Sequence, residues 1–523
     1  MLSIPSLIAK SAKYYSKKTA IIFGEKKFTF RAVNERANRL ANGLLGLGVK
    51  RGDRVASLNR NCHQHIEIVF ARYKIGAVEV ILNPRLSEEE LAWQINDSES
   101  ETIFVAEEFL DKVRSILSLC KGIKHIIALS GASGEEIDYE KILESSSPEE
   151  PPQLGIELDE GALWAILYTT GTTGTPKGIV HLLRTTWAIT RNLLLDLIPD
   201  LSSRDTFLGL QPLYHAVGTF ILPCWMRGTT HVIVPDFKPE IAFDTIEKEK
   251  VTVIKTVPTV LLRLLDHPDI KKRNLQSVRT LIYGASPMPV EKLKHAIQIF
   301  GSVFIQNYGQ SEVPMCISLL RKEDHVMEGT TVQTDRLASV GRPYTCVEVR
   351  VVDENGKDVP LGEIGEVIVR GDHMMKEYWK LPQETGTTVK GGWVYTRDMA
   401  KMDKEGYIYL VDRKSEMIIT GGLNVYPNEV EQVLYEHPAV QEAAVFGVPD
   451  KDWGESVKAA VVLKPDVTIS EQELIEFCKN RIGSYKKPKT IDFMTELPKT
   501  PEGKLLRRKI SEPYWRGFEK KVH

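Results

Sequence analysis

The sequence lacks the features that mark secreted, membrane-spanning or nucleic-acid-binding chains. Its 523 residues include only six cysteines, and no two of them have the spacing of a metal-binding pair. No apolar run reaches the length of a membrane span, and the first residues show no charged stretch followed by an apolar one. The formal net charge of -2 gives no general attraction to nucleic acid or to acidic membranes. These absences predict a cytoplasmic protein with reduced thiols, no signal peptide and no transmembrane segment.

An alternation of strand and helix patterns fills the N-terminal part. Apolar residues recur at helical spacing over 33–45, directly after a strand-like stretch at 27–30. Short strands are predicted at 55–58 and 78–82, with a further helix between them. Such alternation predicts an α/β fold of layered subdomains with a largely parallel sheet.

The pattern changes twice towards the C-terminus. Alternating residues at 347–352 and 366–370, with turns at Asn355-Gly356 and Leu361-Gly362, predict a small β-rich subdomain. From Arg413 a compact α+β pattern begins. Its predicted helices are 428–436 and 471–481, and its predicted strands are 443–446 and 459–463. We therefore predict an N-terminal domain at 1–412 and a small C-terminal domain at 413–523.

The most informative segment is a loop rich in glycine and threonine, Tyr168-Thr-Thr-Gly-Thr-Thr-Gly-Thr-Pro-Lys-Gly178. Its glycines let several backbone N–H groups converge on one anion, while threonine hydroxyls and Lys177 add donors and positive charge. The spacing differs from that of the common nucleotide P-loop, which ends in Gly-Lys-Ser/Thr. A flexible surface loop is the alternative. It is disfavoured because a Pro-Lys pair and an apolar run at 163–167 adjoin the loop.

This segment resembles the signature loop of the adenylate-forming superfamily, which includes acyl-CoA synthetases, luciferases and peptide-synthetase adenylation domains. The resemblance covers nearly the whole chain and is greatest to fatty-acyl-CoA ligases. It implies that the loop binds the β- and γ-phosphates of ATP, with Thr170 and Lys177 also acting in catalysis. The implied phosphate-binding residues are Thr169, Thr170, Gly171, Thr172, Thr173, Gly174, Thr175 and Lys177.

Gln306-Asn-Tyr-Gly-Gln-Ser-Glu312 resembles a second motif of the family. A flat ring such as Tyr308 can stack on adenine, and an amide such as Gln306 or Asn307 can bind the edge of the base. Glu312 offers the hard oxygen that Mg²⁺ prefers. The resemblance also assigns Gly309 to the nucleotide site and Ser311 to the α-phosphate, where the family usually has threonine. Taken alone, the segment could be a strand end and a solvated turn.

Further matches complete the nucleotide site. Gly284-Ala285-Ser286 resembles the segment that lines the adenine pocket. Asp398 stands where the family binds the ribose hydroxyls, and a carboxylate suits a diol because it offers two acceptor oxygens. Arg413 matches an arginine that also contacts the ribose. Arg397 replaces the glycine usual before the aspartate, which puts the local backbone shape in question.

The remaining matches concern the C-terminal domain. Gly421-Gly422 resembles the loop that builds the tunnel for the pantetheine arm of coenzyme A. An ordinary turn before a helix capped by Asn428 is the plainer interpretation. Lys504, framed by proline and glycine, resembles the catalytic lysine of adenylation. The family places an aspartate or lysine hinge where this chain has Ser415.

By resemblance, the acyl pocket should draw on 211–222, 283–288 and 307–318. These segments hold no lysine or arginine, and Glu312 is their only acidic residue. That composition argues against amino acids and dicarboxylates, and fatty, alicyclic and aromatic monocarboxylates all fit it. The resemblance of Tyr283-Gly-Ala-Ser-Pro-Met288 to fatty-acyl ligases implies a medium- or long-chain fatty acid. An aromatic or alicyclic acid is the alternative. His215 could orient the carboxylate or gate the pocket, but it could equally be a packed structural histidine.

The resemblance thus implies an ATP-dependent ligase that needs Mg²⁺, forms an acyl-adenylate from a small carboxylic acid, and transfers the acyl group to coenzyme A. Two rivals remain. The acceptor could be the thiol of a carrier protein, or the chain could be a nucleotide-binding regulator without activity. The oligomeric state is not predicted.

Overall fold

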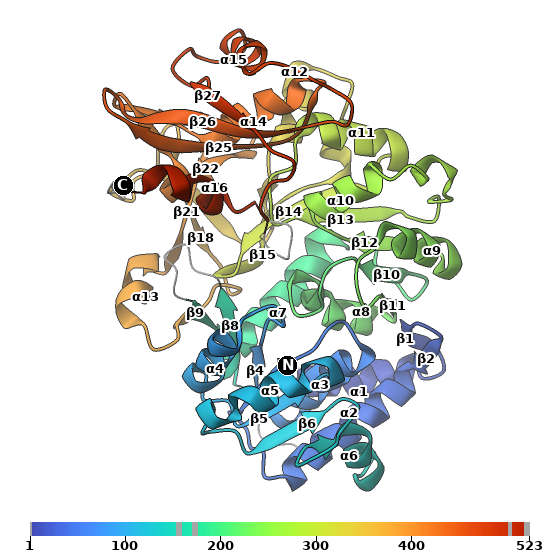
Figure 1. The fold of residues 1–523 in the computed structure, drawn as a ribbon. Coiled ribbons are helices and arrows are strands. Elements are labelled where there is room, and N and C mark those ends of the chain that lie inside the picture. Colours follow the sequence, from blue (N-terminus) through green and yellow to red (C-terminus); the bar gives the residue numbers. More distant parts are fainter. Residues whose placement is uncertain (1–2, 153–158, 170–175, 500–504, 517–523) are drawn as a thin grey trace.

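The computed structural model describes residues 3–152, 159–169, 176–499 and 505–516. Two large sheets form the N-terminal part, which occupies the bottom and the right of Figure 1. In the nine-stranded sheet the strands from β14 to β1 run parallel, and only the edge strands are antiparallel. Its order is β16 (Arg342–Pro343), β15 (Val313–Leu320), β14 (Phe304–Gln310), β13 (Thr280–Gly284), β12 (Val253–Lys255), β10 (Thr206–Gly209), β11 (Thr230–Ile233), β1 (Thr19–Phe23) and β2 (Lys26–Thr29).

The eight-stranded sheet repeats this design, with parallel strands from β8 to β7 and two antiparallel strands at one edge. Its order is β19 (Glu377–Tyr378), β9 (Lys177–Leu182), β8 (Leu163–Thr169), β4 (Val78–Ile81), β3 (Arg54–Leu58), β5 (Thr102–Val105), β6 (His125–Ala128) and β7 (Ile137–Asp138). The predicted layered α/β fold with largely parallel sheets is confirmed.

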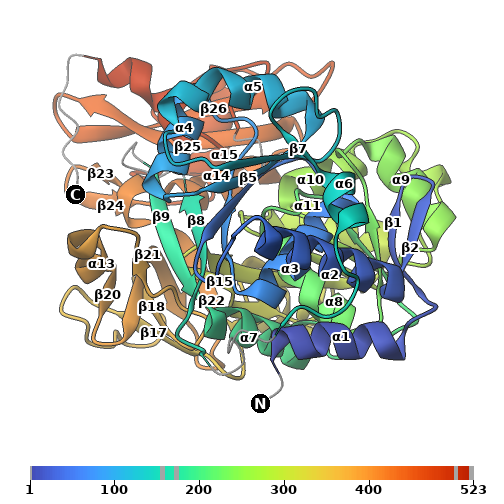
Figure 2. The same ribbon diagram turned by 90° about the horizontal axis from the view of Figure 1, so that it is seen from below.

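Helices cover the faces of both sheets (Figures 1 and 2). One core joins both sheets to α1 (Ile4–Tyr14), α2 (Phe30–Gly46), α3 (His63–Ile75), α7 (Leu183–Asn192) and α8 (Ile221–Arg227). The other face of the nine-stranded sheet packs on α9 (Pro239–Glu249), α10 (Pro258–Leu265) and α11 (Val290–Phe300). The eight-stranded sheet packs on α4 (Glu88–Asp97) and α5 (Leu110–Ile116) on one face, and on α2, α3 and α6 (Tyr139–Ser145) on the other. The predicted periodicity of α2 is confirmed, since Val33, Ala37 and Leu40 are buried.

The β-rich subdomain is also confirmed, and it extends further than predicted. Its sheet contains β17 (Glu348–Val352), β18 (Gly365–Arg370), β21 (Trp393–Met402), β20 (Val389–Lys390) and β22 (Ile408–Arg413). The short helices α12 (Thr331–Asp335) and α13 (Pro382–Thr388) lie nearby in sequence. Gly356 and Gly362, in the two predicted turns, have φ angles of 76° and 85°, which favour glycine.

A second small sheet forms the C-terminal part, at the top of Figure 1. It contains β24 (Leu423–Val425), β23 (Ile418–Thr420), β26 (Gly454–Leu463), β25 (Val440–Asp450) and β27 (Thr490–Phe493). Helices α14 (Pro427–Glu436) and α15 (Glu471–Lys479) share an apolar core with one face, and α16 (Arg507–Ser511) packs with the other. Strands β25 and β26 are longer than the predicted 443–446 and 459–463.

The prediction that Asn428 caps α14 is wrong. The N-cap is Tyr426, which makes no side-chain cap hydrogen bond, and Pro427 occupies the first turn. The backbone N–H of Asn428 instead donates to the Asp412 carboxylate on β22, at 2.8 Å. Burial raises the pKa of Asp412, and its carboxyl oxygen still provides the acceptor that caps the helix from outside.

The connection between β22 and β23 is a short 3-10 helix, Lys414–Glu416, in which Ser415 is exposed. Arg507 lies against this connection. Its guanidinium pairs with Glu431 at 2.7 Å and also with Glu416. The start of α16 is therefore tied both to α14 and to the connection. In the part of the chain that the structure describes, no helix is long and apolar enough to cross a membrane.

Candidate active site

Three groups of predicted site residues lie at or after the carboxyl ends of the parallel strands β10, β13 and β14, where ligands of such sheets commonly bind. Gly284 ends β13. A Cβ atom there would lie 2.1 Å from the backbone oxygen of Asn307 on β14, so the close approach of these strands requires glycine. Ala285 follows with a φ of 73° and is exposed, and Ser286 is half-buried. The predicted adenine-pocket segment is therefore a sharp, strained turn.

The predicted adenine and ribose residues meet. Tyr308 is buried on β14, and its hydroxyl donates to Asp398 Oδ2 on β21 at 2.5 Å. The guanidinium of Arg413 on β22 lies 3.3 Å from Asp398 Oδ1. Burial and the Asp398 charge together raise the pKa of Tyr308 well above its ordinary value, so the hydroxyl stays a donor. Both carboxylate oxygens are thus held in place by partners from other strands.

The backbone at Arg397 keeps the shape expected of the glycine that usually precedes the aspartate. It adopts a φ of 61°, the left-handed conformation that normally selects glycine, and its side chain is exposed. Its backbone N–H donates to Glu366 Oε1 at 3.0 Å. The chain therefore keeps a glycine-like turn before Asp398 in spite of the substitution.

We expect Arg397→Val to lower the free energy of unfolding by roughly 1–2 kcal/mol, because a β-branched residue fits the left-handed region poorly. Arg397→Gly is the matched control. It relieves the steric penalty but loses about 0.5–1 kcal/mol to unfolded-state entropy, so the two effects nearly cancel. Urea unfolding of both variants checks this. Equal stabilities for the valine and glycine variants would contradict the backbone assignment.

Glu312 and Lys177 lie on either side of one tyrosine that the sequence did not single out. The hydroxyl of Tyr378 donates to Glu312 Oε1 at 2.8 Å, and the Lys177 ammonium lies 5.3 Å from the centre of the Tyr378 ring. Tyr378 is on β19, which pairs with β9, the strand that Lys177 begins. In the sequence, Tyr378 stands in the mainly polar stretch Lys376-Glu-Tyr-Trp-Lys380, and nothing in that stretch indicates a functional role. The pairing of distant strands, not a local motif, places it here.

No cluster of three or more histidine, cysteine, aspartate or glutamate side chains occurs among the described residues. The predicted magnesium ligand among the described residues is Glu312. This donor set fits Mg²⁺, which commonly keeps one or two carboxylates and takes its other ligands from phosphates and water. It does not fit a structural metal enclosed by protein ligands.

Two parts of the predicted site fall outside the described residues: Thr170, Gly171, Thr172, Thr173, Gly174 and Thr175 of the phosphate loop, and Lys504. The residues that flank the loop are described. Thr169 ends β8, Lys177 begins β9, and the two residues are partners across this antiparallel pair.

The amides of the second motif are engaged inside the protein. Gln306 Oε1 accepts from the Tyr283 hydroxyl at 3.4 Å. Asn307 accepts from the Lys255 ammonium at 3.0 Å and donates to the Met315 carbonyl at 3.3 Å. Both side chains are buried, so each is oriented by protein partners before any ligand binds.

The hairpin after these amides is narrow and strained. A Cβ at Gly309 would lie 2.5 Å from the Met315 nitrogen, and Met315 itself has a φ of 64°. Ser311 and Glu312 are half-buried at the turn. Ala285, Met315 and Arg397 all have left-handed backbones although none is glycine. Strain of this kind collects at functional sites.

His215 lies in the loop after β10 and is half-buried, with its ring 4.7 Å from that of Tyr214. The loop is fixed by the buried Asn61, which accepts from the Leu213 N–H at 2.7 Å and donates to the Gln211 carbonyl at 3.3 Å. The structure thus places His215 at the same sheet edge as the other candidates.

Gly421 and Gly422 form the turn of the β23–β24 hairpin and are exposed. Their φ angles are 57° and 78°, and a Cβ at Gly421 would lie 2.3 Å from the Trp453 ring. Both positions therefore require glycine for structural reasons alone.

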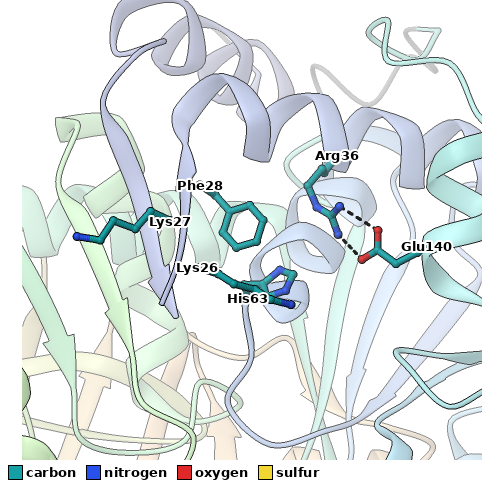
Figure 3. A pocket seen from close by; sticks show the side chains of 6 residues that line it. All are labelled: Lys26, Lys27, Phe28, Arg36, His63 and Glu140. Carbon is teal, nitrogen blue, oxygen red and sulfur yellow. Dashed lines mark hydrogen bonds and ion pairs between the residues drawn. The ribbon is translucent and has the colours of Figure 1, made fainter. Parts of the chain in front are cut away.

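A cavity of about 330 Å³ lies elsewhere, beside the β1–β2 hairpin (Figure 3). Its most prominent cation, Arg36, pairs with Glu140 at 2.7 Å and with the buried Glu67 at 3.0 Å. His63 is likewise bound to Glu67, at 2.8 Å, and packs on Phe28. Arg36 and His63 therefore belong to a structural network around Glu67.

Comparison with known proteins agrees with this geometry. The model of the AMP-binding enzyme family matches residues 8–379, and that of the AMP-binding enzyme C-terminal domain matches 429–504. The medium/long-chain-fatty-acid–CoA ligase FadD8 of Mycobacterium tuberculosis is 32% identical, covering 99% of this chain and 91% of its own. The feruloyl-CoA synthase of an Amycolatopsis species is 36% identical over 94% of this chain and 95% of its own.

Among solved structures, the anthranilate CoA ligase AuaEII in complex with anthranoyl-AMP superimposes with a TM-score of 0.88. It is 28% identical, over 98% of this chain and 97% of that one. The chain therefore belongs to the AMP-binding enzyme family. Within that family it is an adenylate-forming ligase of the acyl-CoA synthetase class, as its motifs predicted.

Proposed function

We propose that the chain joins a carboxylic acid with a mainly apolar body to coenzyme A, by way of an acyl-adenylate. A medium- or long-chain fatty acid is the favoured class, and an aromatic acid is the second candidate. One observation carries the proposal. The β14–β15 hairpin carries Glu312, a carboxylate suited to Mg²⁺, and its Tyr308 holds Asp398, a carboxylate suited to a ribose.

The reaction has two steps. A carboxylate oxygen of the acid attacks the α-phosphorus of ATP, and the bond to pyrophosphate breaks. The thiol sulfur of coenzyme A then attacks the acyl carbon, loses its proton, and displaces AMP. Positioning and charge neutralisation dominate such phosphoryl chemistry. Mg²⁺ bound with ATP would supply positive charge at Glu312.

The residue roles follow the same proposal. Asp398 accepts from the ribose hydroxyls, held in place by Tyr308 and Arg413. Lys177 and the adjoining loop bind the leaving phosphates, and Lys504 neutralises charge during adenylation. Domain 413–523 rotates about Ser415 between the steps, and replaces Lys504 with the Gly421–Gly422 turn. Ser415, the exposed middle residue of the 3-10 connection, supports this hinge, because its dihedral angles can change without unpacking a buried side chain.

The expected acid follows from the side chains of the predicted pocket segments. Val217, Phe220 and Val313 of these segments are at most 1% exposed and belong to one packed apolar core, which supports an acid with an apolar body. We expect AMP formation that depends on coenzyme A to be much faster with hexanoate, octanoate or benzoate-like acids than with acetate or glycine. A panel of acids read by AMP release tests this. Glycine as the best substrate would contradict the proposal, and AMP release that ignores coenzyme A would contradict the acceptor.

A further inference from the structure

Lys255 is a buried lysine for which the proposed function has so far given no role. Its side chain is 1% exposed at the carboxyl end of β12. Its ammonium donates to the Thr256 carbonyl at 3.2 Å and to Asn307 Oδ1 at 3.0 Å. No carboxylate of the described residues pairs with it. Burying an ammonium without a counter-charge is costly, and here burial lowers the lysine pKa to about 7.

The sheet order places this lysine among the predicted pocket segments. Segment 211–222 follows β10, segment 283–288 overlaps the end of β13, and segment 307–318 spans the β14–β15 hairpin. Strand β12 lies between β10 and β13, so its carboxyl end fills the gap in that row. The sequence argued against dicarboxylates because the three predicted pocket segments contain no lysine or arginine. Lys255 lies outside those segments but beside them in the sheet, so this argument no longer holds.

The register shows which way Lys255 faces. Lys255 pairs with Gly209 on one side and with Ile282 on the other, and Ile282 pairs with Ile305. Paired residues share a face of a sheet. Ile282 and Ile305 belong to the core that contains Val217, Phe220, Val313 and Met315. Lys255 therefore faces the same side as the apolar side chains of the predicted pocket.

Two glycines lie near Lys255 on that side. Gly209 pairs with Lys255 and is covered by Val217, since a Cβ at Gly209 would lie 2.3 Å from Val217 Cγ1. Gly284 lies one pleat beyond Ile282 and pairs with Asn307. As an ammonium, Lys255 has three N–H donors, and two of them are used by the protein. The third has no partner among the described residues. The protonated form of Lys255 thus presents one spare donor, next to Asn307 and on the side of the apolar core.

We propose that Lys255 determines specificity, by donating a hydrogen bond to a second oxygen group on the acyl part of the substrate. The shared chemistry is an acceptor oxygen, borne by a hydroxyl, a carbonyl or a second carboxylate. This inference rests on the proposed function and refines its substrate class. A site that binds a substrate oxygen in this way discriminates strongly against the analogue without it, because its donor would be left unpaired.

Matched acid series test the inference. The probes are hexanoate, 6-hydroxyhexanoate, 6-oxohexanoate and adipate, together with benzoate, its 3- and 4-hydroxy derivatives and terephthalate. We expect kcat/KM of the wild type for at least one oxygen-bearing acid to exceed that for its plain counterpart by about tenfold or more. Lys255→Met, which keeps length but has no donor, should abolish or invert this preference while still accepting the plain acid.

The control is Lys74→Met. Lys74 is also a buried lysine, but it is on α3 and pairs with Glu150 at 2.5 Å, far from the sheet edge of the site. It should leave the ratio between plain and oxygen-bearing acids unchanged. A wild type that prefers the plain acids, or a Lys255→Met variant that loses activity equally on both, would overturn the inference. If no acid supports AMP formation at all, the proposed function itself fails and this inference with it.

Discussion

Replacing Glu312 by glutamine should reduce pyrophosphate release from ATP and acid by about 10²–10³-fold, the usual cost of losing one electrostatic contact to a reacting group. The variant keeps the shape of the side chain, and the amide oxygen can still accept from Tyr378, which now donates at 2.8 Å. It loses the charge that attracts Mg²⁺. The fold should survive, because Glu312 is half-buried at a turn and not in a core. Near-normal pyrophosphate release would remove Glu312 from the metal site.

Tyr378→Phe is the matched control for this variant. It removes the hydrogen bond to Glu312 and retains both the carboxylate charge and the aromatic ring near Lys177. The lost hydrogen bond joins a hydroxyl to a charged carboxylate, and such a bond contributes at least about 1.5 kcal/mol, so we expect a loss of about tenfold, still smaller than that of the glutamine variant. Raising the Mg²⁺ concentration should partly restore the glutamine variant and should affect the phenylalanine variant little. The opposite pattern would mean that Glu312 acts by positioning Tyr378 and does not bind the metal.

Replacing Lys504 by alanine should separate the two steps of the reaction. We expect acyl-adenylate formation to fall by about 10²–10³-fold, while thioester formation from synthetic acyl-adenylate and coenzyme A changes much less. The reason is the proposed rotation, which takes this lysine out of the site after the first step. The measurement is a pair of half-reactions, pyrophosphate release and thioester formation, followed on the same preparation.

Lys499→Ala controls for the loss of any lysine near Lys504. Lys499 pairs with Glu442 at 2.5 Å within the C-terminal part, so its loss should affect stability and leave both half-reactions nearly unchanged. Comparable losses in both half-reactions for Lys504→Ala would show that the lysine stays in the site throughout, or that the domain has lost its fold. Circular dichroism separates these two cases. Unchanged adenylation would exclude Lys504 from the chemistry.

The layered fold could be predicted because its strands and helices carry their own periodic patterns. The same holds for the motifs, which lie at strand ends and therefore converge once the strands are parallel. Strands β25 and β26 were recognised only in their apolar middle. Their ends, near Pro449 and Glu455, carry residues that interrupt a strand pattern, and only the long antiparallel pairing makes them regular.

The missed features depend on contacts between distant segments. Tyr378 reaches Glu312 only because β19 pairs with β9, and nothing near residue 378 in the sequence signals this. Lys255 sits in the apolar stretch Val251-Thr-Val-Ile-Lys-Thr-Val257, where a lone lysine was itself a signal. Its position between β10 and β13 became visible only with the strand order.

The hydrogen bond from Asn428 to Asp412 crosses the boundary between the two proposed domains. This hydrogen bond therefore stabilises the domain orientation seen here relative to any rotated one. Any rotation that carries α14 away from β22 leaves the Asn428 amide without this acceptor, at a cost of about 1 kcal/mol, the usual contribution of a helix cap. That corresponds to roughly a fivefold bias towards the orientation seen here. The hydrogen bond between Asn428 and Asp412 would thus help to set the rate of the change between the adenylation step and the thioester step.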